Sequence, residues 1–218
     1  LTLTPTSSVS GASLVKNGAG TLTLRGTGSY SGGTQLNDGT LIVGNGRALG
    51  SGDVTVDALT TLNIANVPLA GPGAIHLAGT LRGTGNAAYR GAVYLDNTNV
   101  SLIAATPADA LRLESGLVGA GHSLTLDGLG LITLAGGASG LATLTQNAGS
   151  QLNPGTGQRI VSTGTQTYQG VLTGSGGVLL NSTGGAAITA DNPDNALGGR
   201  LSVDTAGPVA LAGHLGAL

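Results

Sequence analysis

The chain has 218 residues, of which only 8% are charged, and its ten acidic and eight basic side chains give a net charge of −2. Charge this sparse offers no basic patch that could neutralise phosphates, so the composition argues against a nucleic-acid partner. Cysteine is absent, which excludes a disulfide framework and thiol chemistry. Hydrophobic residues make up 40% of the chain, too many for a disordered polymer. The apolar runs are nevertheless too short for this segment to insert into a membrane.

Large aromatic side chains, which usually fill the centre of a globular core, are nearly missing. The chain has four Tyr and neither Phe nor Trp, but it has 41 Gly. The glycines follow no three-residue period, which excludes collagen. Leu, Val, Ile, Ala and Thr must therefore fill the interior, and this favours a narrow core made of similar stacked layers.

Short apolar–polar–apolar triplets recur along the whole chain, and each is bounded by residues typical of turns. Alternation with a period of two places the two aliphatic residues on one face of a strand and the middle residue on the other. Turns are predicted at 68–73, 154–157 and 192–195, and the segment 104–113, which has the most helix-like pattern, is predicted to be a loop followed by a strand. The predicted strands are 22–24, 41–43, 54–56, 62–64, 75–77, 93–95, 100–103, 111–113, 124–126, 131–134, 141–145, 159–162, 170–173, 178–180, 187–189, 201–203 and 209–211.

Strands this short do not suit a β-sandwich, whose strands usually have about five or six residues. They fit an all-β solenoid, in which each turn of the coil (a rung) stacks on the previous one. With about 20–25 residues per rung, the chain would form roughly nine to eleven rungs and a rod on the order of 45 Å long. No linker or shift in composition interrupts residues 1–218, so we expect one continuous segment, which is a fragment of a longer rod.

Candidate catalytic and metal-binding residues form no known motif. The carboxylates follow turn-forming neighbours, as in Asn37-Asp38-Gly39, and are interpreted as turn residues. Two segments with calcium-like character, 50–54 and 191–195, lack the tandem copies or the terminal Glu of calcium loops, and the second is interpreted as a solvated loop. The histidines, His76, His122 and His214, are widely separated, and His76 is predicted to be exposed. We therefore predict no catalytic, cofactor-binding or metal-binding residue and no cofactor.

The four tyrosines are the remaining candidates for contact with a ligand, because exposed aromatic rings often stack on sugars. Tyr30 is interpreted as packing a corner of the coil. The same interpretation is favoured for Tyr89, Tyr94 and Tyr168, with sugar binding by an exposed ring as the alternative.

Residues 14–56 contain an ordered series of short motifs: Lys16, GAGTLTL at 18–24, YSGGT at 30–34, NDGTL at 37–41 and ALGSG at 48–52. This series resembles the passenger-associated transport repeat, also called the autotransporter-associated β-strand repeat, of type V secreted bacterial adhesins. The resemblance implies that the solenoid is a right-handed parallel β-helix.

The resemblance also implies a function. Proteins with this repeat are exported unfolded through an outer-membrane β-barrel translocator, fold outside the cell and serve there as a stalk or adhesive surface. We therefore expect a non-catalytic segment of a secreted or cell-surface protein, either an autotransporter or a two-partner secretion adhesin. Such a segment would support adhesion or biofilm formation, and passenger folding during export, and its ligand would be a host or matrix glycan or protein.

Two other functions remain open from the sequence. One is a carbohydrate-active β-helix enzyme, a polysaccharide lyase or hydrolase, which needs two or more Asp and a basic residue in one lateral groove. The other is an element of export and folding that has no binding role of its own.

Overall fold

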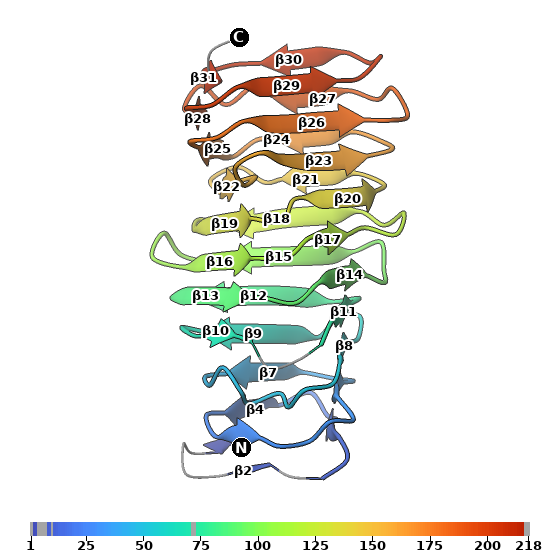
Figure 1. The fold of residues 1–218 in the computed structure, drawn as a ribbon, viewed down its shortest axis with the longest axis vertical. Helices are drawn as coiled ribbons and strands as arrows, with labels where there is room; N and C mark the ends of the chain where they lie inside the picture. Colours follow the sequence, from blue (N-terminus) through green and yellow to red (C-terminus); the bar gives the residue numbers. More distant parts are fainter. Residues whose placement is uncertain (1, 4–7, 10, 71–72, 216–218) are drawn as a thin grey trace.

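The described part of the chain consists of strands and turns that coil into a stack of about ten rungs. The computed structural model describes residues 2–3, 8–9, 11–70 and 73–215. Neighbouring strands in each sheet run parallel, and the stack rises from the N-terminus to the C-terminus in Figure 1. Among the described residues there is no helix of the length and hydropathy needed to cross a bilayer. The predicted all-β solenoid is confirmed.

The sides of the stack are three long sheets and one short strand pair. The eleven-stranded sheet contains, in spatial order, β1 (Thr2–Leu3), β4 (Thr21–Leu24), β7 (Thr40–Val43), β9 (Thr61–Ala65), β12 (Thr80–Thr84), β15 (Val100–Ala104), β18 (Leu124–Gly128), β21 (Leu144–Gln146), β24 (Gln166–Tyr168), β27 (Ile188–Ala190) and β30 (Val209–Leu211). The eight-stranded sheet contains β10 (Pro68–Leu69), β13 (Asn86–Tyr89), β16 (Ala110–Leu113), β19 (Leu131–Leu134), β22 (Gln151–Asn153), β25 (Val171–Gly174), β28 (Ala196–Leu197) and β31 (His214–Leu215).

The ten-stranded sheet contains β3 (Leu14–Lys16), β6 (Thr34–Leu36), β8 (Val54–Val56), β11 (Ile75–Leu77), β14 (Val93–Leu95), β17 (Leu117–Val118), β20 (Ala138–Leu141), β23 (Gln158–Ser162), β26 (Val178–Ser182) and β29 (Leu201–Asp204). The short pair is β2 (Ser8–Val9) with β5 (Thr27–Gly28). In Figure 1 the near strands, such as β23 and β26, run to the right and the far strands of the eleven-stranded sheet run to the left while the chain rises. The coil is therefore right-handed.

The register of the eleven-stranded sheet repeats the same residue types from rung to rung. On its outer face, hydroxyl residues lie beside one another in an unbroken row: Thr21, Thr40, Thr61, Thr80, Ser101, Thr125, Thr145, Thr167 and Thr189. The next residue of each strand points inward, and a row of leucines runs in register from Leu22 to Leu126. Rows of like side chains at about 4.8 Å spacing bury one another continuously.

The interior becomes polar after the leucine row ends. Gln146 follows Leu126 in register and Tyr168 follows Gln146. Gln166 is fully buried, and its Nε2 donates to the carbonyl oxygens of Ile160 at 3.2 Å and Asn181 at 2.8 Å. The Tyr168 hydroxyl donates to Gln166 Oε1 at 2.7 Å. Because each buried polar group needs a partner, this network restricts how the C-terminal rungs can pack.

Most predicted strands are confirmed, and the triplets have the expected orientation: Val54 and Val56 are buried while Thr55 is exposed. The single strand predicted at 141–145 is wrong, because the chain turns a corner between β20 and β21. The turn predicted at 68–73 is also wrong at its start, where Pro68 begins β10, and residues 71–72 lie outside the described residues. Proline is tolerated there because β10 is the edge of its sheet. The turn at 154–157 and the loop-then-strand at 104–113 are confirmed.

Candidate interaction surface

The segment with the motif series is held together by a buried lysine. Lys16 ends β3 with 7% of its surface exposed, and its Nζ donates to the carbonyl oxygens of Asn17 at 3.1 Å, Gly18 at 2.5 Å and Asp38 at 2.8 Å. Asp38 belongs to the next rung, so one ammonium group joins the corners of two rungs. A buried charge requires such partners, and three carbonyl oxygens satisfy its three donors.

Removing this lysine is expected to destabilise the N-terminal rungs. Lys16→Met keeps most of the apolar stem but leaves three carbonyl oxygens without their donor, so we expect a loss of about 2 kcal/mol in the free energy of unfolding. Urea unfolding followed by circular dichroism measures this loss. The control Arg25→Gln removes an exposed cation and should change stability by no more than about 0.5 kcal/mol. Equal stability of the Lys16→Met and wild-type chains would show that the ammonium group does not brace the corner.

Tyr30 packs a corner, as predicted. Its side chain is 1% exposed, and its hydroxyl donates to the carbonyl oxygen of Ala48 at 3.0 Å. Gly50 passes directly over it: φ is +64°, and a Cβ atom there would lie 2.1 Å from the Tyr30 carbonyl oxygen. Burial raises the pKa of the Tyr30 phenol, which therefore stays a donor over the physiological range.

One of the carboxylates is buried and forms hydrogen bonds that join two rungs. Asp109, 7% exposed, accepts from the backbone N–H of Gly85 at 2.8 Å through Oδ1, and from the N–H and Oγ1 of Thr106 at 3.0 and 2.9 Å through Oδ2. The Gly85 hydrogen bond, with help from Thr106 and Arg82, holds the pKa of Asp109 below its ordinary value. The turn interpretation of this residue is confirmed, and its contact with Gly85 joins two successive rungs.

The depressed pKa of Asp109 makes its contribution to stability dependent on pH. A folded-state pKa below the unfolded value adds stability above the unfolded value, and this stability is lost as the pH falls through the folded pKa. Asp109→Asn should therefore lower the free energy of unfolding by about 1–2 kcal/mol at neutral pH. The difference from wild type should shrink as the pH falls below the unfolded value of about 4 and through the lowered folded pKa, because the carboxyl group then takes up a proton. Urea unfolding of both chains across this range tests the claim, and a difference that does not change with pH would contradict it.

The other carboxylates are mostly exposed and separate from one another. Asp53 Oδ1 accepts from the Ala74 N–H at 2.7 Å, which places the 50–54 segment at a corner between rungs. In the 191–195 segment Asp191 and Asp194 are exposed, but Asn195 is only 2% exposed. The prediction of a solvated loop is therefore wrong for Asn195, whose Oδ1 accepts from Leu172 N–H at 2.8 Å and whose Nδ2 donates to Ala190 and Ala212. Within the described residues, no three His, Asp or Glu side chains are grouped closely enough to hold a metal ion.

The outer face of the ten-stranded sheet carries the exposed aromatic residues. His76 on β11 and Tyr94 on β14 are register neighbours, and their rings stack with centroids 5.4 Å apart and an interplanar angle of 15°. His76 Nδ1 lies 3.1 Å from Asp96 Oδ2, and 38% and 46% of these two side chains are exposed. Tyr89 and Tyr168 are fully buried, as the packing interpretation predicts. The same interpretation is wrong for Tyr94, which is 37% exposed in the middle of β14, so among the tyrosines its ring is the one available to a ligand. The prediction that His76 is exposed holds in part, since Asp96 and Tyr94 cover two sides of it.

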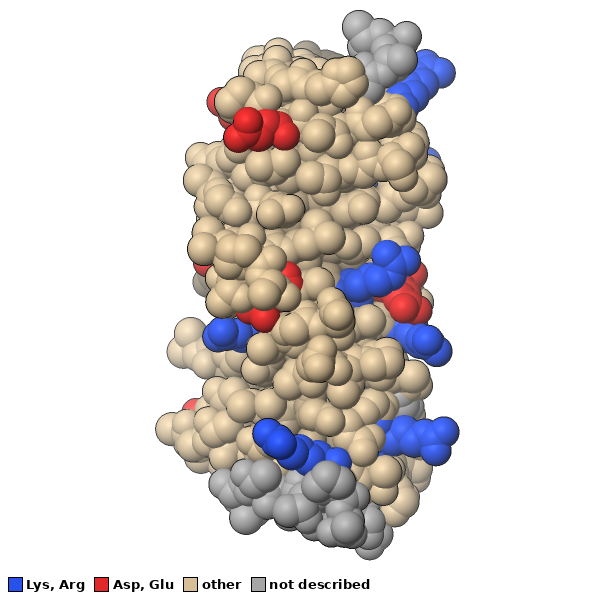
Figure 2. Space-filling view, turned by 90° about the vertical axis from the view of Figure 1, so that its left-hand side faces the viewer, with Lys and Arg blue, Asp and Glu red and all other residues tan. Residues whose placement is uncertain are grey.

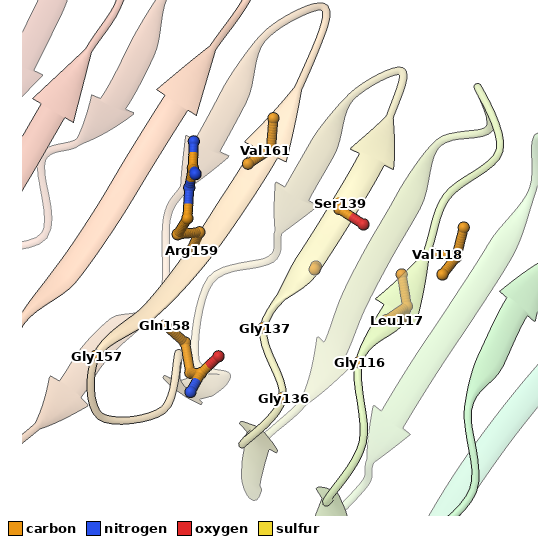
Figure 3. Close-up of a pocket in the computed structure, with 11 residues that line it drawn as sticks. Gly116, Leu117, Val118, Gly136, Gly137, Ser139, Gly157, Gln158, Arg159 and Val161 are labelled. Atoms are coloured by element: carbon orange, nitrogen blue, oxygen red, sulfur yellow. The ribbon is translucent and has the colours of Figure 1, made fainter.

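Hollows lie on both sides of this aromatic stack along the same face. One, of about 570 Å³, is lined by Ser13, Val15, 31–35, 52–53 and Thr55. The other, of about 440 Å³, is lined by 116–118, 136–139, 157–159 and Val161. In Figure 3 the second hollow has Val118, Ser139 and Arg159 standing on successive strands, with glycine turns beside them. Gly137 has φ of +74°, and a Cβ atom there would lie 2.7 Å from the Arg159 carbonyl oxygen, so the turn needs glycine.

The lining residues of these two hollows include one carboxylate, Asp53, and one arginine, Arg159, in different hollows. The paired carboxylates and basic residue that a glycosidase or lyase needs are not brought together there. Figure 2, which views the eight-stranded sheet, shows a surface that is mostly uncharged, with isolated groups of acidic and basic side chains. Arg90 and Arg112 share Glu114, at 3.3 and 4.0 Å.

Residues 14–43 match the family model of the passenger-associated-transport-repeat. The match begins with β3 and the Lys16 corner, includes Tyr30, and ends with β7. It confirms the resemblance predicted from the motifs, although it stops before the predicted end at residue 56. No curated protein and no solved structure matches the chain.

Proposed function

We propose that the chain is a stalk segment in the passenger of a type V secreted bacterial surface protein, in keeping with a structural rather than catalytic role. It would leave the cell unfolded through an outer-membrane β-barrel translocator and fold on the outside. At the cell surface it would hold other parts of the passenger away from the membrane and support adhesion and biofilm formation. The observation that carries the proposal is the passenger-associated repeat at 14–43 continuing into an unbroken stack of rungs.

The physics of the stack supports this role. Each rung contacts mainly its two neighbours, so folding can begin in one rung and spread along the chain as it emerges. The parallel register and the buried rows, such as the leucine row from Leu22 to Leu126, make the coil a stiff spacer, because bending it would separate buried rows on one side. Its length can change by whole rungs without changing the contacts within a rung.

A deletion experiment tests the proposal. The full chain is placed between an N-terminal epitope and an outer-membrane translocator, and surface display and protease resistance are measured. Deleting residues 80–100 removes one rung and puts Ser101 in the place of Thr80, its register partner. We expect this shortened chain to be displayed and to resist protease as the wild type does.

The matched control deletes residues 80–89, which removes about half a rung and breaks the register. This variant should lose protease resistance on the cell surface. A wild-type chain that is degraded at the surface would contradict the proposed stalk. If deletion of residues 14–43 stops display while the remaining rungs fold normally in vitro, the main role of residues 14–43 is in export, and their role in the stalk is secondary.

A further inference from the structure

A groove on the ten-stranded sheet follows the long axis of the stack. The hollow of about 440 Å³ over β17, β20 and β23 adjoins a second hollow of about 310 Å³ over β23, β26 and β29. The two share Gly157, Gln158 and Arg159. Because these strands are consecutive in the sheet, the hollows together form one shallow channel across five rungs, here called the axial groove.

The axial groove is positively charged and lacks acidic groups. Arg159 and Arg200 are exposed in it, and no Asp or Glu is among its lining residues. Within the described part of the chain, neither arginine forms an ion pair, whereas Arg90 and Arg112 at a nearby corner are paired with Glu114. Each guanidinium group can therefore bind a carboxylate or sulfate through two parallel hydrogen bonds.

The spacing of the two arginines points to a linear polymer. Arg159 is in register with Leu179 and, one rung further, Ser202, which is two residues after Arg200. The arginines are thus two rungs apart along the axis and two residues apart along the strand direction, which is about 12 Å in all at the usual spacings. This separation is comparable to the length of one disaccharide unit in an extended polysaccharide.

The remaining lining groups suit a hydroxyl-rich ligand. Ser139 and Ser202 present hydroxyl groups, and Gln158 donates through Nε2 to the Thr156 carbonyl at 3.3 Å, which leaves its Oε1 to accept from a ligand. The rest of the lining is glycine, Ala138 and aliphatic side chains such as Val118, Val161 and Leu179, which form an open surface without the deep pocket that anchors an aromatic residue of a protein partner.

We propose that the axial groove binds a linear acidic polysaccharide, with Arg159 and Arg200 pairing with acidic groups on successive disaccharide units. The proposal rests on the proposed location outside the cell, where such polymers occur. It adds a binding surface to a stalk, and it identifies the ligand by charge and shape.

The test measures binding of the purified 218-residue chain to immobilised alginate, which carries carboxylates, to heparin, which carries sulfates as well, and to neutral dextran. We expect the chain to bind at least one of the two acidic polymers, with an affinity that falls as the salt concentration rises, and not to bind dextran.

The double variant Arg159→Gln/Arg200→Gln should weaken this binding about tenfold or more. The control Arg25→Gln/Arg47→Gln removes the same charge from exposed positions outside the groove and should change binding less than about twofold. Because all four arginines are exposed, circular dichroism should show all variants folded.

Each other outcome counts against the proposal. Equal weakening by the two double variants would show that net charge, and not the groove, attracts the polymer. Equal binding of dextran, or stronger binding of duplex DNA than of either acidic glycan, would also overturn it. If the folded wild-type chain binds none of the polymers, the proposed polysaccharide binding in the axial groove is refuted. The proposed role as a stalk would not be affected, since surface display is measured separately.

Discussion

Leu102→Asp is expected to unfold the centre of the stack. Leu102 lies on β15, is fully buried, and has Leu81 and Leu126 as register neighbours in the leucine row. A carboxylate at this position has no partner in the apolar interior, so it must either stay charged at great cost or take up a proton. We expect a loss of at least about 4 kcal/mol, at the upper end of what single substitutions cause.

The matched control differs by one position on the same strand. Ser101→Asp places the same group on the outer face, between Thr80 and Thr125, where water reaches it. The expected loss is about 1 kcal/mol or less, from the poor strand propensity of Asp. Urea unfolding of both variants measures the difference, and similar losses for the two would refute the assignment of inner and outer faces.

Gly128→Ala is expected to force two rungs apart. Gly128 ends β18 with φ of +98°, and a Cβ atom there would lie 2.0 Å from the carbonyl oxygen of Ala104, its register partner. Backbone cannot yield as a flexible side chain can, so the rung below must shift. We expect a loss of more than about 3 kcal/mol, since a misplaced Ala combines backbone strain with a steric clash.

Gly121 provides the matched control, because a substitution there introduces the backbone strain without a contact between rungs. It has a similar backbone conformation, φ of +82°, but nothing lies within 4 Å of the added Cβ. Gly121→Ala should therefore cost only the strain of the left-handed conformation, about 1–2 kcal/mol. The difference between the two free energies of unfolding reports the contact between rungs. Equal values would indicate that β15 and β18 are not packed as closely as described.

The repeating strands could be predicted because local patterns in the sequence determine them. Triplets such as Ile75-His76-Leu77 and Val93-Tyr94-Leu95 fix which residues point inward, and turn residues mark the corners. The rung length could not be fixed, because it varies from 18 residues between Ile75 and Val93 to 24 between Leu102 and Leu126. Insertions at corners change this length without changing the strands.

Because the rung length could not be fixed, the stacking of His76 on Tyr94 could not be predicted from the sequence. Both residues were recognisable as middle positions of triplets, but only the register shows that their strands are adjacent. The axial groove could not be predicted from the sequence for the same reason, because Arg159 and Arg200 are 41 positions apart in sequence and only the register shows that they are two rungs apart in space.

The polar interior of the C-terminal rungs was missed for a different reason. Gln146, Gln166 and Asn195 have the hydropathy of exposed residues, yet 2% or less of each is exposed. Their burial depends on backbone carbonyls of neighbouring strands and turns, as in the bond from Gln166 Nε2 to Asn181 O on β26. Hydrogen-bond partners that far away in sequence leave no local pattern.

Paired cysteines test the parallel stack most directly, because the natural chain contains none. Thr80 and Ser101 are register partners on adjacent rungs, and their Cα atoms should be about 4.8 Å apart, within the range of a disulfide. Thr80 and Thr125 are two rungs apart, at about 10 Å, which is too far. Under mild oxidation, Thr80→Cys/Ser101→Cys should form an intramolecular disulfide and Thr80→Cys/Thr125→Cys should not. A first pair that stays reduced in the folded chain, or a second pair that closes as readily, would contradict the stacked solenoid.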